Sequence, residues 1–345
     1  MTASADTPSI DAPRRAWSPL PLLAMALAAA AVGAAAIGAV VIPLPDILSG
    51  SLTDQQEAVL LTIRLPRVLL SVVVGAALAV SGAALQGLFR NPLADPGLIG
   101  ISSGAALAVA MVIVLAGPLS GLFGLYGLAV AAFCGGFATC VLIFRITRLT
   151  GGFSVTYMLL AGIAINAIAG AGTGFLTYLS DDQQLRALSF WTMGSLGGAL
   201  WPAVAVVATV TVPATLVLVR HAGDINILLL GEDEARHLGI DADRLKRIIV
   251  VCAALSVGAA VAVSGIIGFV GLVVPHLVRL TIGPDHRLLI PASAVLGGIL
   301  LLVADTCART VVAPAEMPVG ILTSLIGGPF FLWLLFKQYA GRFGL

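Results

Sequence analysis

Long stretches without a charged side chain constrain the fold of this chain more than any other feature. A helix that crosses about 30 Å of hydrocarbon needs roughly 20 apolar residues, and runs of that length follow one another along the sequence. Only 10% of the 345 residues are charged and 59% are hydrophobic, whereas about 25% of the residues in an average soluble domain are charged. This composition excludes a soluble globular protein and an intrinsically disordered one, and it predicts an all-α polytopic membrane protein.

The uncharged runs define the expected membrane spans. They cover residues 20–42, 68–89, 96–144, 149–180, 187–219, 248–278, 288–304 and 317–336, and 96–144 is long enough for two helices with a turn at 117–121. The run 248–278 fits either one helix or two short ones. Lys and Arg concentrate in cytoplasmic loops. Two crossings are therefore favoured, since they place all but four of the 18 basic residues inside; the four outside are Arg64, Arg67, Arg186 and Arg309. We therefore expect ten transmembrane helices with both termini in the cytoplasm, the seventh and eighth being short or broken.

The chain is expected to form one transmembrane domain over residues 19–340, preceded by a disordered cytoplasmic tail over residues 1–18. The first apolar run is too long for the core of a secretory signal, so the first helix is expected to stay uncleaved. Residues Gly75–Gly82 recur almost unchanged as Gly258–Gly265. With ten spans the two copies run in opposite directions, which indicates either inverted-repeat halves, as in many transporters, or chance in a chain rich in Ala, Val and Gly.

The predicted spans hold almost no ionisable side chain near their centres, where proton- or ion-coupled carriers usually place one. Asp305 lies near the end of a span, where an ion pair or a helix-end position explains it. Neither lysine, Lys246 or Lys337, completes a G-x4-G-K-[ST] phosphate loop. The histidines and cysteines show no catalytic or metal-ligand spacing, and a net charge of +1 gives no reason to expect nucleic acid. We expect a chain that is not an enzyme, binds no metal or cofactor, and depends on a partner for any ATP hydrolysis.

Three of the external arginines flank helix ends. Arg64 and Arg67 start the second span, and Arg309 ends the ninth. They could anchor to lipid phosphates or pair locally with Glu57 and Asp305, or they could dock an acidic partner from outside. Charge alone leaves these alternatives open.

Two cytoplasmic segments are candidates for contacts with a partner or with the transported molecule. In the largest loop, 220–247, residues 228–239 have the spacing of a short amphipathic helix, which could bind a peripheral subunit or lie at the membrane interface. In the turn 90–97, Asp95 can cap the next helix with Pro96 at its first position. That turn places Asn91 and Leu93 at the cytoplasmic mouth.

These segments together resemble the permease subunits of type II ABC importers for haem, ferric siderophores and vitamin B12. The resemblance covers nearly the whole chain from Arg64 on. The matching segments are 64–67, 81–97, 231–239, 268–279, 285–287, 304–309 and 316–320.

The resemblance implies a homodimer in the bacterial inner membrane, two cytoplasmic ATPase subunits that bind ATP and Mg²⁺, and a periplasmic binding protein. It implies that Arg64, Arg67 and Arg309 dock the binding protein. The coupling helix that contacts the ATPase would comprise Gly231, Glu232, Ala235, Leu238 and Gly239. The cytoplasmic gate would comprise Asn91, Leu93, Val155 and Thr156, although relatives carry small hydroxyl residues where this chain has Val155.

The segment 181–198, on the external side, most resembles haem permeases. Two copies of Arg186 across a dimer axis could attract the two propionates of haem, while Phe190, Trp191 and Met193 offer apolar surface to the macrocycle. Alternatively, Arg186 pairs with Asp181 or Asp182, and the aromatic residues only anchor the chain at the interface. We expect an importer of haem or a related iron chelate that works by alternating access. A siderophore or vitamin B12 permease is the alternative, ahead of a proton-coupled carrier and of a scaffold or receptor.

Overall fold

A computed structural model describes residues 19–38, 40, 42–115, 126–149 and 154–343. The expected tail 1–18 and the expected turn at 117–121 lie outside the described residues. Within the described part of the chain every regular element is helical. In chain order they are α1 (Leu20–Ala36), α2 (Leu44–Ser49), α3 (Asp54–Val59), the π-helical turn η1 (Leu60–Arg64), α4 (Leu65–Leu88), the 3-10 turn η2 (Pro96–Ile99), α5 (Ile101–Leu115), α7 (Gly127–Leu149), α8 (Val155–Leu179), α9 (Asp182–Thr192), α10 (Trp201–Arg220), α11 (Ala222–Leu228), α12 (Glu232–His237), α13 (Ala242–Ser264), α14 (Val270–Thr281), α15 (His286–Ala308) and α16 (Val319–Phe343).

Ten apolar helices among the described residues match the ten predicted spans. Six are long and apolar enough to cross a membrane by length and composition, namely the continuous helix Asp54–Leu88 together with α7, α8, α10, α13 and α15. The remaining four apolar helices are shorter: α1, α5, α14 and the Val319–Leu334 part of α16. The all-α polytopic fold is therefore confirmed.

The seventh and eighth helices were both expected to be short or broken, and this is confirmed for the eighth helix, α14, and wrong for the seventh, α13. Only α14 is short, with 12 residues, whereas α13 has 23 residues and begins at Ala242. Its N-cap is Asp241, whose carboxylate accepts a hydrogen bond from the backbone N–H of Arg244 at 2.9 Å. The run of uncharged residues predicted too late a start for this helix, because its first turns carry charged side chains. The second span likewise begins well before Val68, since helical structure is continuous from Asp54.

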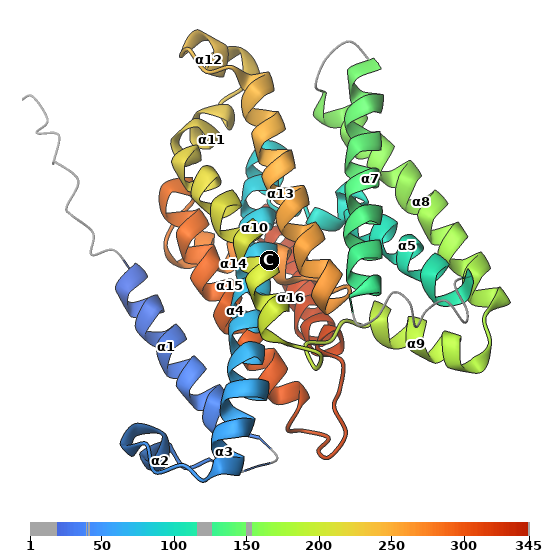
Figure 1. Cartoon of the computed structure of the whole chain (residues 1–345). Coiled ribbons are helices and arrows are strands. Elements are labelled where there is room, and N and C mark those ends of the chain that lie inside the picture. The colour runs from blue at the N-terminus through green and yellow to red at the C-terminus, as the bar shows by residue number, and fades with distance from the viewer. Residues whose placement is uncertain (1–18, 39, 41, 116–125, 150–153, 344–345) are drawn as a thin grey trace, which may run out of the picture.

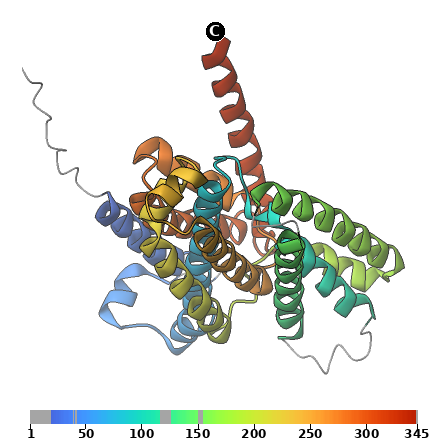
Figure 2. The ribbon, with the colours of Figure 1, turned by 90° about the horizontal axis from the view of Figure 1, so that it is seen from above.

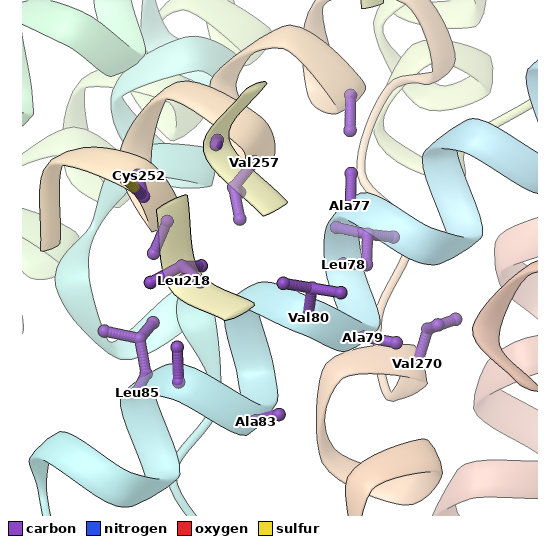
Figure 3. Packing of buried hydrophobic residues seen from close by; sticks show 14 of the residues in the cluster. Ala77, Leu78, Ala79, Val80, Ala83, Leu85, Leu218, Cys252, Val257 and Val270 are labelled. Atoms are coloured by element: carbon purple, nitrogen blue, oxygen red, sulfur yellow. The ribbon is translucent and has the colours of Figure 1, made fainter. Parts of the chain in front are cut away.

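Helix α4 forms the centre of the core. Most of its side chains are buried, and it packs against α10, α13, α14 and α15. Figure 3 shows Ala77, Leu78 and Val80 of α4 among residues from neighbouring helices. A Cβ atom at Gly75 would overlap the backbone of Gly297 in α15, so small residues are what allow these two helices to approach so closely.

A second group of helices, α5, α7, α8 and α9, packs together beside this core (Figure 1). We call this group the side lobe; it joins the core where α5 and α7 contact α13. One end of the molecule carries α12 and the other carries α2, α3 and α9 (Figure 1), and we name these ends the α12 face and the α9 face. Helices α4 and α13 run in opposite directions between them, as an inverted repeat requires; the repeat itself stays a prediction. Helix α16 leaves the bundle on one side (Figure 2).

Candidate functional site

A buried ion cluster joins three segments near the α9 face. The guanidinium of Arg67 in α4 donates to both carboxylate oxygens of Asp305 in α15, at 2.9 to 3.1 Å. Its other nitrogen donates to Glu316, in the segment before α16, at 2.9 Å and 3.0 Å. Arg67 and Asp305 are 8% and 2% exposed, so this bidentate pair is shielded from water. Asp305 thus forms an ion pair, one of the two roles expected of it, with Arg67 as its main partner.

Arg64 and Arg309 cap the end of α1, and Arg309 also lies 4.0 Å from the carboxylate of Asp305. Arg64 donates to the carbonyl oxygens of Ala35 and Ala36 at 2.7 and 2.8 Å, and also to that of Val40. Arg309 donates to the carbonyl oxygen of Ala34. A helix C-terminus leaves its last carbonyls without partners and attracts positive charge, which explains why both arginines turn inward. Among the described residues, no ion pair joins Glu57 to Arg64. Docking of a binding protein by these arginines stays a prediction.

An open groove lies where α9, the segment between α13 and α14, and α16 meet. Its volume is about 650 Å³, within the range typical of small-molecule sites. The predicted residue Met193 contributes to its lining. The other lining residues are Thr192, Ile266, Gly268, Gly320, Ile321, Ser324 and Leu325. The groove is mainly apolar and combines three segments that are far apart in the sequence.

Two glycines allow these segments to meet. Gly265 has a φ of +66°, and a Cβ there would overlap the carbonyl oxygen of Trp191. A Cβ at Gly320 would overlap the carbonyl oxygen of Met193. Any larger residue at either position would push the end of α9 away from its neighbours, so the groove depends on both glycines.

Helix α9 presents the other predicted substrate residues. Arg186, Phe190 and Met193 are spaced three to four residues apart and therefore share a face, and all three are exposed. Trp191 is half-buried and packs against the core. Among the described residues no ion pair joins Arg186 to Asp181 or Asp182. Asp181 is the N-cap of α9, where it accepts from the backbone N–H of Gln184 at 2.8 Å.

The turn 90–97 is tied to the core by one buried side chain. The amide nitrogen of Gln86 donates to the carbonyl oxygens of Ala94 at 3.2 Å and Gly271 at 3.1 Å, which links the turn to α4 and α14. Asn91 is exposed, and its side-chain oxygen accepts from the backbone N–H of Leu93 at 2.9 Å. Asp95 caps η2 as predicted, accepting from Gly97 N–H at 2.7 Å. Burial raises the pKa of the Asp95 carboxyl, and this hydrogen bond opposes part of the rise.

The second part of the predicted gate lies at the start of α8. Val155, the residue after the N-cap Ser154, is half-buried, and Thr156 is exposed. The turn 90–97 reaches α8 further along that helix, where Asn166 donates to the carbonyl oxygen of Gly97 at 3.1 Å. The structure therefore connects the two loops through η2 and α8. Among the described residues, no hydrogen bond joins Asn91 or Leu93 to Val155 or Thr156.

The predicted coupling residues lie in and around α12 (Glu232–His237), which is shorter than the predicted helix 228–239, and Leu228 is the last residue of the separate helix α11. Gly231 precedes α12 with a φ of +142°, Ala235 is fully buried, and Leu238 is 62% exposed. The ammonium of Lys246 in α13 lies 2.8 Å from Glu232 and 2.9 Å from Asp243. These ion pairs hold α12 on the end of α13 with Leu238 facing outward, just before Gly239.

A polar cluster connects α11 to the start of α15. Asn226 accepts from the backbone N–H of His286 at 2.9 Å and from its ring Nδ1 at 2.8 Å, and its amide nitrogen donates to Asp285 at 2.6 Å. An amide oxygen only accepts, so Nδ1 carries the proton. Asp285 also accepts from Arg287 N–H at 2.9 Å, which holds its pKa below the usual value. A Cβ at Gly87 would meet the His286 ring, so the cluster also touches the end of α4.

Sequence reasoning did not assign a role to Gln86, Glu316 or Asn226. Gln86 could have been noticed as the one amide inside the second uncharged run. The partners of Glu316 and Asn226 are 249 and 60 residues away, so no local pattern reveals them. The described residues contain no group of three or more His, Cys, Asp or Glu placed to hold a metal ion.

Comparison with known proteins gives a consistent result. Residues 23–337 match the model of the FecCD transport family. The chain is 55% identical over 294 residues to the hemin transport system permease protein HmuU of Yersinia pestis, covering 85% of this chain and 88% of that one. It is 43% identical over 288 residues to the cobalamin import system permease protein BtuC of Halobacterium salinarum, covering 84% and 76%.

A solved structure has the same fold. It is described as an inward-facing conformation of a metal-chelate type ABC transporter, and it superposes with a TM-score of 0.84 at 34% sequence identity. The superposition covers 92% of this chain and 98% of the other.

Proposed function

The chain belongs to the FecCD transport family, and on this premise we propose that the molecule it carries across the membrane is haem. It is an integral membrane protein of the bacterial inner membrane and the permease component of an ABC importer. The observation that supports haem is the exposed face of α9, where Arg186 has no ion-pair partner among the described residues and shares a surface with Phe190 and Met193. A guanidinium followed by apolar side chains suits a flat macrocycle that carries carboxylates.

The groove beside Met193 supports a homodimer. It is open on one side, and α16, which forms part of its wall, projects from the bundle (Figure 2). Along the protruding helix, Leu325, Leu332 and Trp333 are exposed. A second copy packed against α16 would bury these side chains and would close the groove into a path between the two chains. Each copy would then contribute one Arg186 to the entrance.

The α12 face is proposed to be cytoplasmic. In the homodimer, the α12 faces of the two copies would bind the two ATPase subunits, which hold ATP and Mg²⁺. Leu230 and Leu238 flank α12 and are 67% and 62% exposed, so an apolar groove on a partner could hold them. ATP-driven closure of the partners would displace α12 and α11. The Asn226–His286 cluster would pass this displacement to α4 and so to the turn 90–97, where Asn91 and Leu93 would open or close the inner gate together with Val155 and Thr156.

The α9 face is proposed to receive a periplasmic binding protein. Arg64, Arg67 and Arg309 lie near this face but are occupied inside the chain. Docking would therefore require acidic residues of the binding protein to compete with Glu316 and with backbone carbonyls. Glu316 is the most accessible of these partners, since its side chain is 49% exposed.

The test is reconstitution of the complete transporter in liposomes, with measurement of ATP hydrolysis and of haem accumulated in the lumen. Haem import predicts accumulation and stimulated hydrolysis, both abolished by vanadate. Stimulation by cobalamin or a ferric siderophore but not by haem would keep the importer mechanism and overturn the substrate. The relative named as a cobalamin permease makes cobalamin the second candidate. Vanadate-insensitive haem uptake would instead indicate a carrier that acts without the ATPase.

A further inference from the structure

An apolar hollow of about 350 Å³ lies between α7, α10 and α13, away from the groove beside Met193. No polar atom contributes to its surface. The residues that line it are Tyr126, Ala129, Val130, Phe133, Pro202, Ala203, Val206, Val210, Ala259, Ala262 and Val263.

The hollow exists because small side chains meet at the junction of three helices. Helices α7 and α10 both pack against α13, but the residues that face one another there include Ala129, Ala203 and Ala262. The bulkier Phe133 lies across Gly258 of α13 and closes one side. Helix α7 belongs to the side lobe and α10 to the core, so the hollow lies at the junction of these two parts (Figure 1).

The hollow lies in one half of the membrane and opens to its hydrocarbon. Its residues come from the first turns of α7 and α10 and from the last turns of α13, which places it in the half nearer the α9 face. Val130 and Val206 at its rim are 60% and 58% exposed. Helix α16 leaves the molecule on the opposite side from α7 and α10 (Figure 2), so a second copy packed against α16 would not cover the hollow.

A space of this kind is unsuited to water. An apolar cavity of about 150 Å³ in a soluble protein stays dry and binds small hydrocarbons, and this one is larger and also lacks polar groups. Its surroundings in the membrane are acyl chains. We propose that the hollow is a binding site for one acyl chain of a membrane phospholipid, which fills the junction between the side lobe and the core. Tyr126, at the end nearer the α9 face, is placed where a phenol ring meets the headgroup layer.

The direct test uses the full-length protein in nanodiscs that contain a phospholipid with a photoactivatable diazirine on its acyl chain. After irradiation, labelled peptides are mapped by mass spectrometry. The site predicts that labelling concentrates on residues 126–133, 202–210 and 259–263. Val212 and Leu216 of α10 are the internal comparison, because they are 51% and 63% exposed and do not line the hollow. Equal labelling of Val212, Leu216 and the lining residues would overturn the proposal. Cross-linking of the lining residues to another protein chain, in place of labelling by the lipid, would also overturn it.

A pair of variants separates a specific site from general lipid contact. Ala203→Phe fills the hollow, whereas Val212→Phe adds the same side chain to the lipid-facing surface of the same helix. We expect Ala203→Phe to abolish the concentrated labelling and Val212→Phe to leave it unchanged, with both proteins eluting as the wild type does. If Ala203→Phe does not fold, Ala129→Leu, a smaller change in α7, is tested in its place. Persistent labelling at 202–210 in a folded filled variant contradicts the proposal.

Discussion

The side-chain oxygen of Asn226 accepts two hydrogen bonds from His286, one from the backbone N–H at 2.9 Å and one from ring Nδ1 at 2.8 Å. This contact joins α11 to the first residue of α15, and the ring of His286 lies against Gly87 near the end of α4. Because α12 follows α11 directly, the contact forms a short mechanical path from the surface proposed to bind the ATPase to the turn that holds Asn91.

Asn226→Leu should weaken this path. The substitution removes the acceptor from two donors, and His286 is only 2% exposed, so we expect a loss of about 1–3 kcal/mol locally. In liposomes, fewer haem molecules should be transported per ATP hydrolysed, while the ATPase still binds. Asp224→Asn is the control, because Asp224 lies on the same short helix and its ion pair is with His221 of the neighbouring turn. An unchanged transport ratio in Asn226→Leu would show that α11 does not transmit the movement.

Arg67→Met should destabilise the protein strongly, by about 3–5 kcal/mol, because the buried Asp305 carboxylate loses its bidentate partner and keeps only the more distant Arg309 at 4.0 Å. The double variant Arg67→Met with Asp305→Leu removes both charges and should recover most of the stability in thermal unfolding. Comparing the two variants also tests docking. If Arg67 contacts the binding protein, the double variant folds but its ATPase is not stimulated by that protein. Full stimulation would show that Arg67 is structural only.

Gly265→Ala should disrupt the groove. The residue has a φ of +66°, and the added Cβ would overlap the carbonyl oxygen of Trp191, so we expect destabilisation of at least about 1–3 kcal/mol. Gly268→Ala is the matched control, since nothing lies within 4 Å of a Cβ built there. Thermal unfolding in detergent gives the comparison. Equal stability of the two variants would mean that the end of α9 is not held where the structure has it.

Leu238→Glu should prevent binding of the ATPase subunits without unfolding the permease. The side chain is 62% exposed beside α12, so a charge there costs the free protein little but would be buried unpaired in an apolar interface. Copurification with the ATPase measures the effect. Val311→Glu, an exposed apolar position 70% accessible in the segment before α16, is the control and should copurify normally. Retention of the ATPase by Leu238→Glu would exclude this surface.

The number of spans could be predicted from the sequence because hydrocarbon tolerates few charges, and uncharged runs therefore mark helices. Their ends could not be predicted in the same way. Helix α13 continues through Asp243 and Lys246 because these residues pair with each other and Lys246 also pairs with Glu232. The helix that includes α4 contains Arg67 because Asp305 neutralises it from another helix. Such pairings belong to the tertiary structure.

For the candidate site, local features such as helix caps could be predicted from the sequence, whereas contacts between distant segments could not. The N-cap Asp95 follows from residue type and spacing. The groove depends on α9, α16 and the segment between α13 and α14 meeting at Gly265 and Gly320, and no pattern in one sequence shows which distant segments touch. For the same reason, the inward turn of Arg64 toward the end of α1 was not foreseen.

The most direct test of the central claim compares haem with haem dimethyl ester, which lacks free carboxylates, in liposomes that contain the complete transporter. If Arg186 recognises the propionates, the wild type should accumulate haem faster than the ester by about tenfold, since charge-assisted hydrogen bonds are lost with the ester. Arg186→Gln should remove most of this difference, while Arg186→Lys should keep part of it. Equal uptake of haem and its ester by the wild type, or a preference that persists in Arg186→Gln, would contradict the account.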